Sequence, residues 1–427
     1  MITSSPTLIR QIRVIDPVAN SNSIKDILIV NGIIQAIEAH LDTIPSETEI
    51  IEGKGLILGP GLMDMYSYSG EPGHEERETL DTLIQSAIAG GFTRMAILPQ
   101  TDPPIDNLAT LSHLQQQGNQ MQPSVKLDFW GSLTLKRKGQ QMTELAELAT
   151  AGVIGFTDNQ GIENLGLLRR LLEYLKPLKK PIAMVAEYPS LKGNGVMREG
   201  YTSINYGLPG NPAITETTAV ATILEMVAAT QTPVHLMRIS TRRAVELIAW
   251  GKARGIPITA STTWMHLLLD SEAIASYHPS LRLDPPLGNP EDRLALIEGI
   301  SQGIIDAIAI DHHAYTYEEK TVPFAEAPPG AIGLQLAFPI LWQAFVEKGQ
   351  WSELQLWKAL SSNPRKCLGQ SLPSLKPGNP LESMIFDPQE SWKITPSTLK
   401  SLGTNTPWLG QEIKGKMVLT NSFLGNC

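Results

Sequence analysis

The sequence predicts an α/β fold in which a (β/α)8 barrel is joined to a small β-sandwich. From Gly61 onward, eight short apolar runs rich in β-forming residues alternate with stretches of helical period, which is the pattern of βα units around a parallel sheet. Short alternating segments near both chain ends are typical of antiparallel strands. The 427 residues are enough for a barrel of about 250 to 300 residues and a smaller domain.

The amino-terminal part should supply the first strands of the sandwich. Residues 1 to about 58 contain alternating segments separated by Asn, Gly, Pro and Ser turns: Ile12–Val14, Asp26–Val30, Ile34–Ile37 and Ile50–Ile51. After Pro364 the chain becomes rich in Pro and Gly and then offers two further strands, Ser383–Phe386 and Lys416–Thr420. We therefore predict a composite sandwich from residues 1–58 and 370–427, with the barrel at residues 59–369.

The barrel elements follow from the middle of the chain. Helices are expected at Glu76–Ala89, Thr215–Thr230 and Thr241–Arg254; the first has acidic residues at its start and a Gly-Gly stop at its end, which suits the helix dipole. The eight predicted barrel strands are Gly61–Tyr66, Thr93–Leu98, Val125–Trp130, Val153–Thr157, Ile182–Glu187, Val234–Ile239, Ile256–Thr262 and Asp306–Asp311.

Composition excludes several classes of function. The net charge is −9 without a block of Lys and Arg, so we expect no nucleic-acid partner. No segment approaches the roughly 20 apolar residues of a membrane span, and the start MITSSPTLIRQIRV does not resemble a signal peptide, so a cytoplasmic protein is expected. Cys367 and Cys427 are too few for a disulfide framework or a Cys-rich zinc site.

Polar residues follow most of the predicted strands. In a (β/α)8 barrel the loops after the strands converge on one mouth, where functional side chains lie. The residues expected at this mouth include Asp64, Tyr66, Tyr68, Gln100, Asp158, Asn159, Glu187, Arg238, His266, Asp311, His312 and His313.

A series of short motifs then carries a family resemblance. In chain order they are Gly59-Pro-Gly-Leu-Met-Asp64, Glu71-Pro-Gly73, Glu78-Thr79, Gly90-Gly-Phe-Thr93, Pro99-Gln-Thr-Asp-Pro-Pro104, Gly155-Phe-Thr-Asp158, Ser240-Thr241, Pro285-Pro-Leu287, Asp306-Ala-Ile-Ala309, Ala327-Pro-Pro-Gly330 and Asn405-Thr-Pro407. In this order they resemble the dihydroorotase branch of the amidohydrolase superfamily over nearly the whole chain. The resemblance implies a distorted barrel of the amidohydrolase type, a place in pyrimidine biosynthesis, and one or two zinc ions that activate water for attack on a cyclic amide.

The resemblance also implies where zinc should bind, and most of those positions carry other residues. The family's His-x-His pair falls on Tyr66 and Tyr68, and two further zinc histidines fall on Val185 and Arg238. The two carboxylate positions are retained, the bridging ligand as Asp158 and the ligand and general base as Asp311.

These replacements are severe for a metal site. Zinc needs nitrogen, sulfur or carboxylate donors; valine offers none, tyrosine has a pKa of about 10, and arginine keeps its proton. We therefore expect no metal at the residual positions Asp158 and Asp311. Tyr66 and Tyr68 are expected to fill the vacated space, and Arg238 is expected to pair with Asp158 or Asp311.

The substrate positions implied by the resemblance have changed as well. The family's carboxylate-binding arginine falls on Gly70, its substrate asparagines on Gln100 and Asp284, and its last loop histidine on Tyr315. The loop residues Pro329 and Gly330 are retained. With Tyr66, Tyr68, Val185 and Arg238, these residues form the predicted ligand pocket.

A relocated metal site is the alternative for the histidines. His266, His312, His313 and His74 lie on loops near the mouth, but histidines on separate loops rarely converge with ligand geometry. A structural role is the favoured interpretation.

Three hypotheses of function remain open. The first is a non-catalytic dihydroorotase homologue that serves as a structural or regulatory subunit with aspartate transcarbamoylase, a partner that the resemblance alone implies; a homo-oligomer is also open. The second is an active zinc-dependent dihydroorotase or related cyclic amidohydrolase, which would cleave the C–N bond of dihydroorotate to give N-carbamoyl-aspartate with Asp311 as catalytic residue. The third is a metal-free binder of a small ligand.

Overall fold

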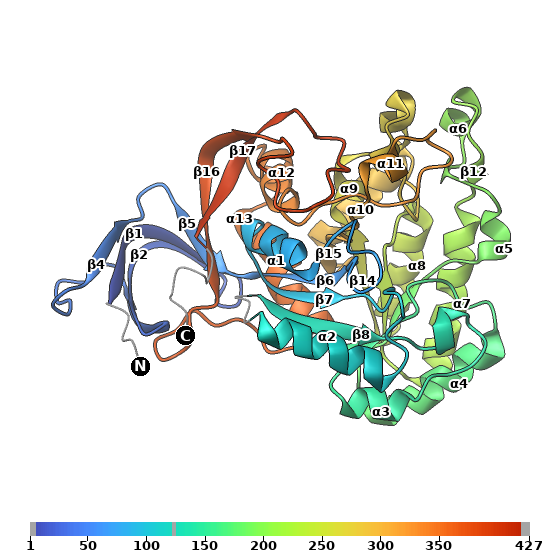
Figure 1. Ribbon diagram of the computed structural model, residues 1–427, viewed down its shortest axis with the longest axis horizontal. Coiled ribbons are helices and arrows are strands. Elements are labelled where there is room, and N and C mark those ends of the chain that lie inside the picture. Colours follow the sequence, from blue (N-terminus) through green and yellow to red (C-terminus); the bar gives the residue numbers. More distant parts are fainter. Residues whose placement is uncertain (1–5, 122–124, 420–427) are drawn as a thin grey trace.

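The computed structural model describes residues 6–121 and 125–419. A β domain lies at one side, and a barrel wrapped by helices forms the rest (Figure 1). Thr420, the last residue of the predicted strand Lys416–Thr420, and Cys427 lie outside the described residues.

The β domain joins strands from both parts of the chain. Its seven-stranded sheet has the order β17-β16-β5-β1-β2-β3, and β4 also pairs with β1. β16 runs antiparallel to β5, which attaches the late strands to the early ones, as the sequence predicts. The domain boundaries after residues 58 and 369 stay a prediction. The strands are β1 (Thr7–Asp16), β2 (Ser21–Val30), β3 (Ile33–Glu38), β4 (Glu49–Glu52), β5 (Ile57–Pro60), β16 (Ser383–Lys393) and β17 (Glu412–Leu419).

The barrel contains all eight predicted strands. They form two four-stranded parallel sheets with the orders β6-β7-β8-β9 and β10-β13-β14-β15. A bridge between Phe156 and Ile182 joins the sheets on one side, and the Tyr68 N–H donates to the His312 carbonyl on the other at 2.9 Å. The strands are β6 (Leu62–Ser67), β7 (Phe92–Ile97), β8 (Lys126–Gly131), β9 (Gly155–Phe156), β10 (Ala183–Val185), β13 (Val234–Met237), β14 (Ile258–Thr263) and β15 (Ala307–Ala309).

Alternation along each strand separates the barrel interior from its outer layer. On β6, Met63 and Met65 pack inside the barrel, whereas Leu62 belongs to the core between strands and helices. Trp130 fills the interior, and its indole N–H donates to the Met65 carbonyl at 2.9 Å. The interior is therefore a packed core, and the mouth is the place for function.

The predicted helices Thr215–Thr230 and Thr241–Arg254 are present within one residue at each end, as α7 and α8. The first predicted helix starts later than expected, because Thr79 caps α1 through Thr82 and the preceding Glu78 turns into the protein. The helices are α1 (Leu80–Ala89), α2 (Leu108–Gln120), α3 (Leu145–Thr150), α4 (Leu165–Leu175), α5 (Pro189–Lys192), α6 (Tyr201–Asn205), α7 (Ile214–Thr230), α8 (Arg242–Ala253), α9 (Trp264–Leu268), α10 (Pro290–Gln302), α11 (Tyr317–Lys320), α12 (Ala337–Leu341), α13 (Glu353–Trp357) and α14 (Asn363–Cys367).

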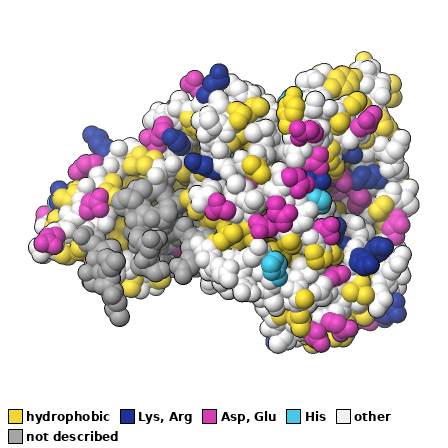
Figure 2. Space-filling model, viewed as in Figure 1, with side chains coloured by type: hydrophobic (Ala, Val, Ile, Leu, Met, Phe, Trp, Pro, Cys, Tyr) yellow, Lys and Arg dark blue, Asp and Glu magenta, His cyan; other side chains and the backbone are white. Residues whose placement is uncertain are grey.

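The segment between β10 and α7 was not predicted in detail. It contains α5, the short paired strands β11 (Met197–Arg198) and β12 (Gly210–Asn211), and α6, which projects from the barrel end (Figure 1). On the face in Figure 2, Lys and Arg side chains are scattered among Asp and Glu side chains. Within the described ranges, no helix is long and apolar enough to cross a membrane.

Asp26 anchors the β domain through its buried carboxylate. The carboxylate accepts hydrogen bonds from the backbone N–H groups of Gln11 at 2.9 Å and Leu41 at 3.0 Å. Burial opposes the charge, but these N–H groups outweigh burial and hold the pKa of Asp26 below its ordinary value of 3.8. The carboxylate therefore stabilises the fold at neutral pH.

We predict that Asp26→Ala lowers the free energy of unfolding by about 1–3 kcal/mol, because two backbone donors lose their acceptor. Urea denaturation measures this loss, with Asp42→Ala as control, since Asp42 is 90% exposed and contacts the same His40. A lowered folded-state pKa means that this stabilisation is present above the unfolded-state pKa and disappears as pH falls through the folded-state value. An equal loss in both variants would contradict the role of Asp26.

Candidate functional site

Three strand ends position the centre of the mouth. Asn159 follows β9, Arg238 follows β13 and Asp311 follows β15. All three have left-handed backbones, with φ of 56°, 54° and 54°. Such conformations cost on the order of 1–3 kcal/mol for non-glycine residues and cluster at functional sites. The barrel therefore holds these side chains in place at an energetic cost.

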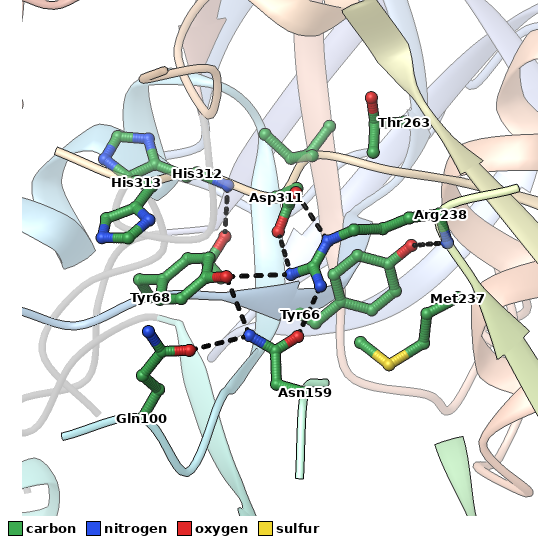
Figure 3. A network of polar contacts seen from close by, with 12 residues as sticks. Tyr66, Tyr68, Gln100, Asn159, Met237, Arg238, Thr263, Asp311, His312 and His313 are labelled. Carbon is green, nitrogen blue, oxygen red and sulfur yellow. Dashed lines mark hydrogen bonds and ion pairs between the residues drawn. The ribbon is translucent and has the colours of Figure 1, made fainter. Parts of the chain in front are cut away.

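Arg238 lies at the centre of a polar network (Figure 3). Its Nε and Nη2 donate to the two Asp311 carboxylate oxygens at 2.7 and 2.5 Å, and its Nη1 donates to the Asn159 amide oxygen at 2.5 Å. The side chain is 3% exposed. Burial opposes its charge, but the Asp311 carboxylate outweighs burial and holds the pKa of Arg238 well above its ordinary value. Arg238 is thus a permanent cation.

Tyr66 and Tyr68 pack around this cation. The Arg238 guanidinium carbon lies 5.2 Å from the Tyr66 ring centroid and 5.8 Å from that of Tyr68. The Tyr66 hydroxyl accepts from the Arg238 backbone N–H at 3.2 Å and contacts Ser261 Oγ at 2.9 Å. Burial raises the pKa of both tyrosines, so neither is a phenolate that could bind a metal.

Little space is left beside Arg238. The remaining void, lined by Val185, Met237 and Arg238 among others, has a volume of about 10 Å³. That is about the space of one water molecule. This part of the mouth is filled by protein.

Asp158 does not pair with Arg238. Its carboxylate accepts from the Thr134 backbone N–H at 2.9 Å and the Thr134 hydroxyl at 2.5 Å. Burial raises the pKa of Asp158. Of the two partners expected for Arg238, the structure thus has Asp311, and Asp158 fixes the loop of Thr134.

The donor set does not fit the zinc that the resemblance implies. Across residues 6–121 and 125–419, no three or more His, Cys, Asp and Glu side chains come together as metal ligands. The Asp311 carboxylate accepts hydrogen bonds from the Arg238 guanidinium, and the Asp158 carboxylate accepts from Thr134. A zinc ion beside Arg238 would meet a fixed positive charge.

The histidines near the mouth are engaged elsewhere. His312 Nε2 contacts Glu78 at 3.1 Å, and its Nδ1 accepts from the Gly333 N–H at 3.1 Å. His266 Nδ1 contacts Thr263 Oγ1 at 2.8 Å, and burial lowers the pKa of His266 to about 4. His74 is half-exposed and contacts Glu76. The relocated metal site is not assembled from these side chains.

Gly70, the position of the family's arginine, is tightly surrounded by the backbone of its own loop. The Gly70 carbonyl accepts from the His74 N–H at 2.6 Å. A Cβ atom at Gly70 would lie 2.4 Å from the carbonyl oxygens of both His74 and Glu78. No side chain fits at this position without movement of the backbone.

The other predicted pocket residues have protein partners. Lys192 Nζ donates to the Asp284 carboxylate at 2.6 Å. The Tyr315 hydroxyl donates to the Pro329 carbonyl at 3.1 Å. Gly330 donates its N–H to the Arg282 carbonyl at 2.8 Å. Gln100 accepts from the Asn159 amide at 3.0 Å. The backbone groups of the retained loop are therefore used within the protein.

A second part of the mouth is open. A cavity of about 530 Å³ is lined by four predicted pocket residues, Tyr68, Gly70, Gln100 and Tyr315. One of its walls is a ring stack in which His313 lies 3.7 Å from Tyr68 and 4.3 Å from Tyr315, centroid to centroid. Val185 and Arg238 line the filled part instead.

The sequence places Asn159 at the mouth, but not its role of connecting Arg238 to Tyr68 and Gln100. Sequence reasoning missed two other residues of the mouth. Lys192 bridges Glu187 and Asp284, at 3.0 and 2.6 Å, from an unpredicted helix. Arg137, which lines the open cavity, lay in a loop without any motif.

Comparison with known proteins gives consistent matches. The family model described as "Dihydro-orotase-like" matches residues 55–244. A "Probable dihydroorotase-like protein" of Synechocystis sp. is 47% identical over 96% of this chain and 98% of its own length. A "Dihydroorotase" of Pelotomaculum thermopropionicum is 37% identical over 96% and 95%.

A solved structure matches the fold. The L-hydantoinase (dihydropyrimidinase) from Arthrobacter aurescens superposes with a TM-score of 0.85 over 97% of this chain and 94% of the other, at 21% identity. This likeness confirms the predicted barrel with its β domain.

We predict that Arg238→Ala destabilises the protein by about 1–3 kcal/mol, because it leaves the Asp311 carboxylate, which is only 18% exposed, without its countercharge. Chemical denaturation measures the change, with Arg243→Ala on the exposed face of α8 as matched control. The double variant Arg238→Met/Asp311→Leu should recover part of the loss. Full stability of Arg238→Ala would refute the role of this ion pair.

Proposed function

The chain belongs to the dihydroorotase-like family of amidohydrolases, and from that premise we propose that it is a non-catalytic member that acts as a structural or regulatory subunit with aspartate transcarbamoylase. One observation carries the proposal: the Arg238 guanidinium, paired with Asp311, lies where the family resemblance puts a zinc ligand. Members of the amidohydrolase family usually use zinc. A fixed cation opposes zinc at this position.

The loss of catalysis follows from the chemistry of the remaining groups. Hydrolysis of a cyclic amide needs an activated water and a base that can accept its proton. Asp311 is the retained base position, but both its oxygens accept hydrogen bonds from Arg238. With both oxygens engaged, this carboxylate is not placed to take a proton from water, and the void beside Arg238 has a volume of only about 10 Å³.

An active dihydroorotase with a rebuilt site is the second candidate, favoured by relatives that carry the name dihydroorotase. It would use Asp311 with His312 and His266. Against it, His312 has both ring nitrogens engaged by Glu78 and Gly333, and the pKa of His266 is lowered by burial.

A subunit role also needs a contact surface. Tyr201 and Ile204 are 81% and 80% exposed and lie three residues apart on the projecting helix α6, so they share one face. Exposed aromatic and large aliphatic side chains of this kind are typical of protein interfaces. The identity of the partner follows from the family resemblance.

Zinc content and turnover test the loss of catalysis. We predict near-zero zinc per chain by elemental mass spectrometry after dialysis, and no hydrolysis of dihydroorotate, because the donor set is lost. The dihydroorotase of Pelotomaculum thermopropionicum, prepared in parallel, is the positive control. Stoichiometric zinc, or turnover that disappears with chelator or with Asp311→Ala, would support the second candidate.

Co-purification tests the partner. We predict that the tagged chain, expressed in its native cells, brings down aspartate transcarbamoylase, and that Tyr201→Ser/Ile204→Ser reduces the recovered amount several-fold. Tyr174→Ser, 48% exposed on α4, is the control. Recovery of the tagged chain without any transcarbamoylase would contradict the proposal.

A further inference from the structure

A cleft lies at the opposite pole of the barrel from the mouth. Its volume of about 680 Å³ falls in the range of small-molecule pockets, about 300–1,000 Å³. Three of its lining residues, Ile182, Val234 and Ile258, lie where β10, β13 and β14 begin, whereas the mouth is formed where these strands end. Catalytic groups of (β/α)8 barrels lie at the strand ends, so this cleft is separate from the hydrolytic site of the family.

The floor of the cleft is apolar and aliphatic. Its apolar side chains are Ile154, Leu175, Leu178, Pro181, Ile182, Pro233, Val234, Pro257, Ile258 and Leu368. The described lining contains no Phe, Tyr or Trp, the side chains on which the planar ring of a nucleobase would stack. An aliphatic chain needs no such partner, because its burial against apolar surface is favourable in any orientation. The floor therefore favours an aliphatic chain over a planar ring.

Two further side chains of the lining, His235 and Cys367, are chemically inert. His235 Nδ1 lies 2.8 Å from Thr259 Oγ1, and its Nε2 lies 2.8 Å from Ser261 Oγ. Burial lowers the pKa of His235 to about 3, so its imidazole is neutral. Burial raises the pKa of Cys367 to about 12, so its thiol keeps its proton and is no nucleophile. The cleft is thus suited to binding and not to covalent chemistry.

Three lysines give the cleft a positive rim. Lys179, Lys180 and Lys366 line it, and the described lining contains no Asp or Glu. None of the three is among the lysines that form ion pairs within residues 6–121 and 125–419. Lys180 Nζ donates to the Val153 carbonyl at 2.8 Å, which uses one of its three N–H donors. A chain with a net charge of −9 thus gathers unpaired cations at this cleft.

No neighbouring carboxylate balances this rim. Lys179 has a left-handed backbone with φ of 52°, and Lys366 lies in α14 beside Cys367, so both lysines start from fixed elements. Asp306 acts on Cys367 from outside the lining, but its carboxylate is paired with Lys252 at 2.6 Å. The positive charge at the rim therefore remains available to an anion.

We propose that this cleft binds an amphipathic anion, with an aliphatic chain on the apolar floor and an anionic head among Lys179, Lys180 and Lys366. Burial of the chain and attraction of the head to three cations act together, so a chain without charge or a head without chain uses only part of the site. Carboxylate and phosphate heads share this chemistry. The site does not depend on the loss of catalysis, because it lies at the other pole of the barrel.

Isothermal titration of the full chain tests the site, with each probe below its critical micelle concentration. Decanoate and decyl phosphate share a chain and differ in the head, decyltrimethylammonium joins the same chain to a cation, and acetate is a head without the chain. We expect at least one of the two chain anions to bind, the tighter one identifying the head group. The chain cation and acetate should bind at least tenfold more weakly. Equally tight binding of decyltrimethylammonium, or no binding of either chain anion, would overturn the proposal.

Charge variants assign the binding to this cleft. Lys179→Gln/Lys366→Gln should weaken binding of the chain anion by about tenfold, because two cations of the rim are lost. Both side chains are exposed, so the thermal unfolding midpoint should stay the same. Lys136→Gln/Lys138→Gln removes the same charge from exposed positions at the mouth and should leave the affinity unchanged. An equal loss in both double variants, or a loss in the mouth variant alone, would refute the assignment.

A variant of the floor tests the place of the chain. Leu178→Glu puts a carboxylate on the partly buried apolar floor and should abolish binding of the chain anion, because like charge and lost apolar surface both oppose it. Its thermal unfolding curve checks that the variant is folded. Unchanged affinity in folded Leu178→Glu would contradict the proposed site.

Discussion

A buried guanidinium organises the barrel mouth. Removing a charge from water costs several kcal/mol unless it is paired and its hydrogen bonds are satisfied, and Arg238 meets both conditions through Asp311 and Asn159. Arg238 also determines which neighbouring groups donate and which accept, because a guanidinium has donors and no acceptors. The Asn159 amide nitrogen in turn donates to Tyr68 and Gln100, which line the open cavity. The same ion that fills one part of the mouth therefore sets the direction of the hydrogen bonds at the edge of the open cavity.

The mouth combines the scaffold of the family with a different set of side chains. The strand ends still converge, and three non-glycine residues still adopt left-handed backbones there. In place of imidazole donors, the protein has packed aromatic rings and a salt bridge, with Lys192 forming a second ionic link between Glu187 and Asp284. On the Arg238 side this arrangement leaves little space, while the neighbouring cavity stays open.

The fold could be predicted because the apolar runs, their spacing and the Gly and Pro stops are local signals. All eight barrel strands overlap the predicted ones, and α7 and α8 agree closely. The start of α1 could not be predicted, because Glu78 is used in a tertiary contact with His312 and the cap is formed by Thr79. The motifs identified the changed zinc positions. The role of Asn159 and the presence of Arg137 could not be predicted, because both arise where separate loops meet.

The closed loop at Gly70 bears on the evolutionary history of the chain. With carbonyl oxygens 2.4 Å from any added Cβ, an arginine cannot return to this position by a single codon change without first reshaping the backbone. Regaining an arginine here therefore needs coordinated changes in the backbone of this loop, which a single substitution at Gly70 does not provide. A histidine at position 238 would likewise have to replace the Arg238–Asp311 ion pair.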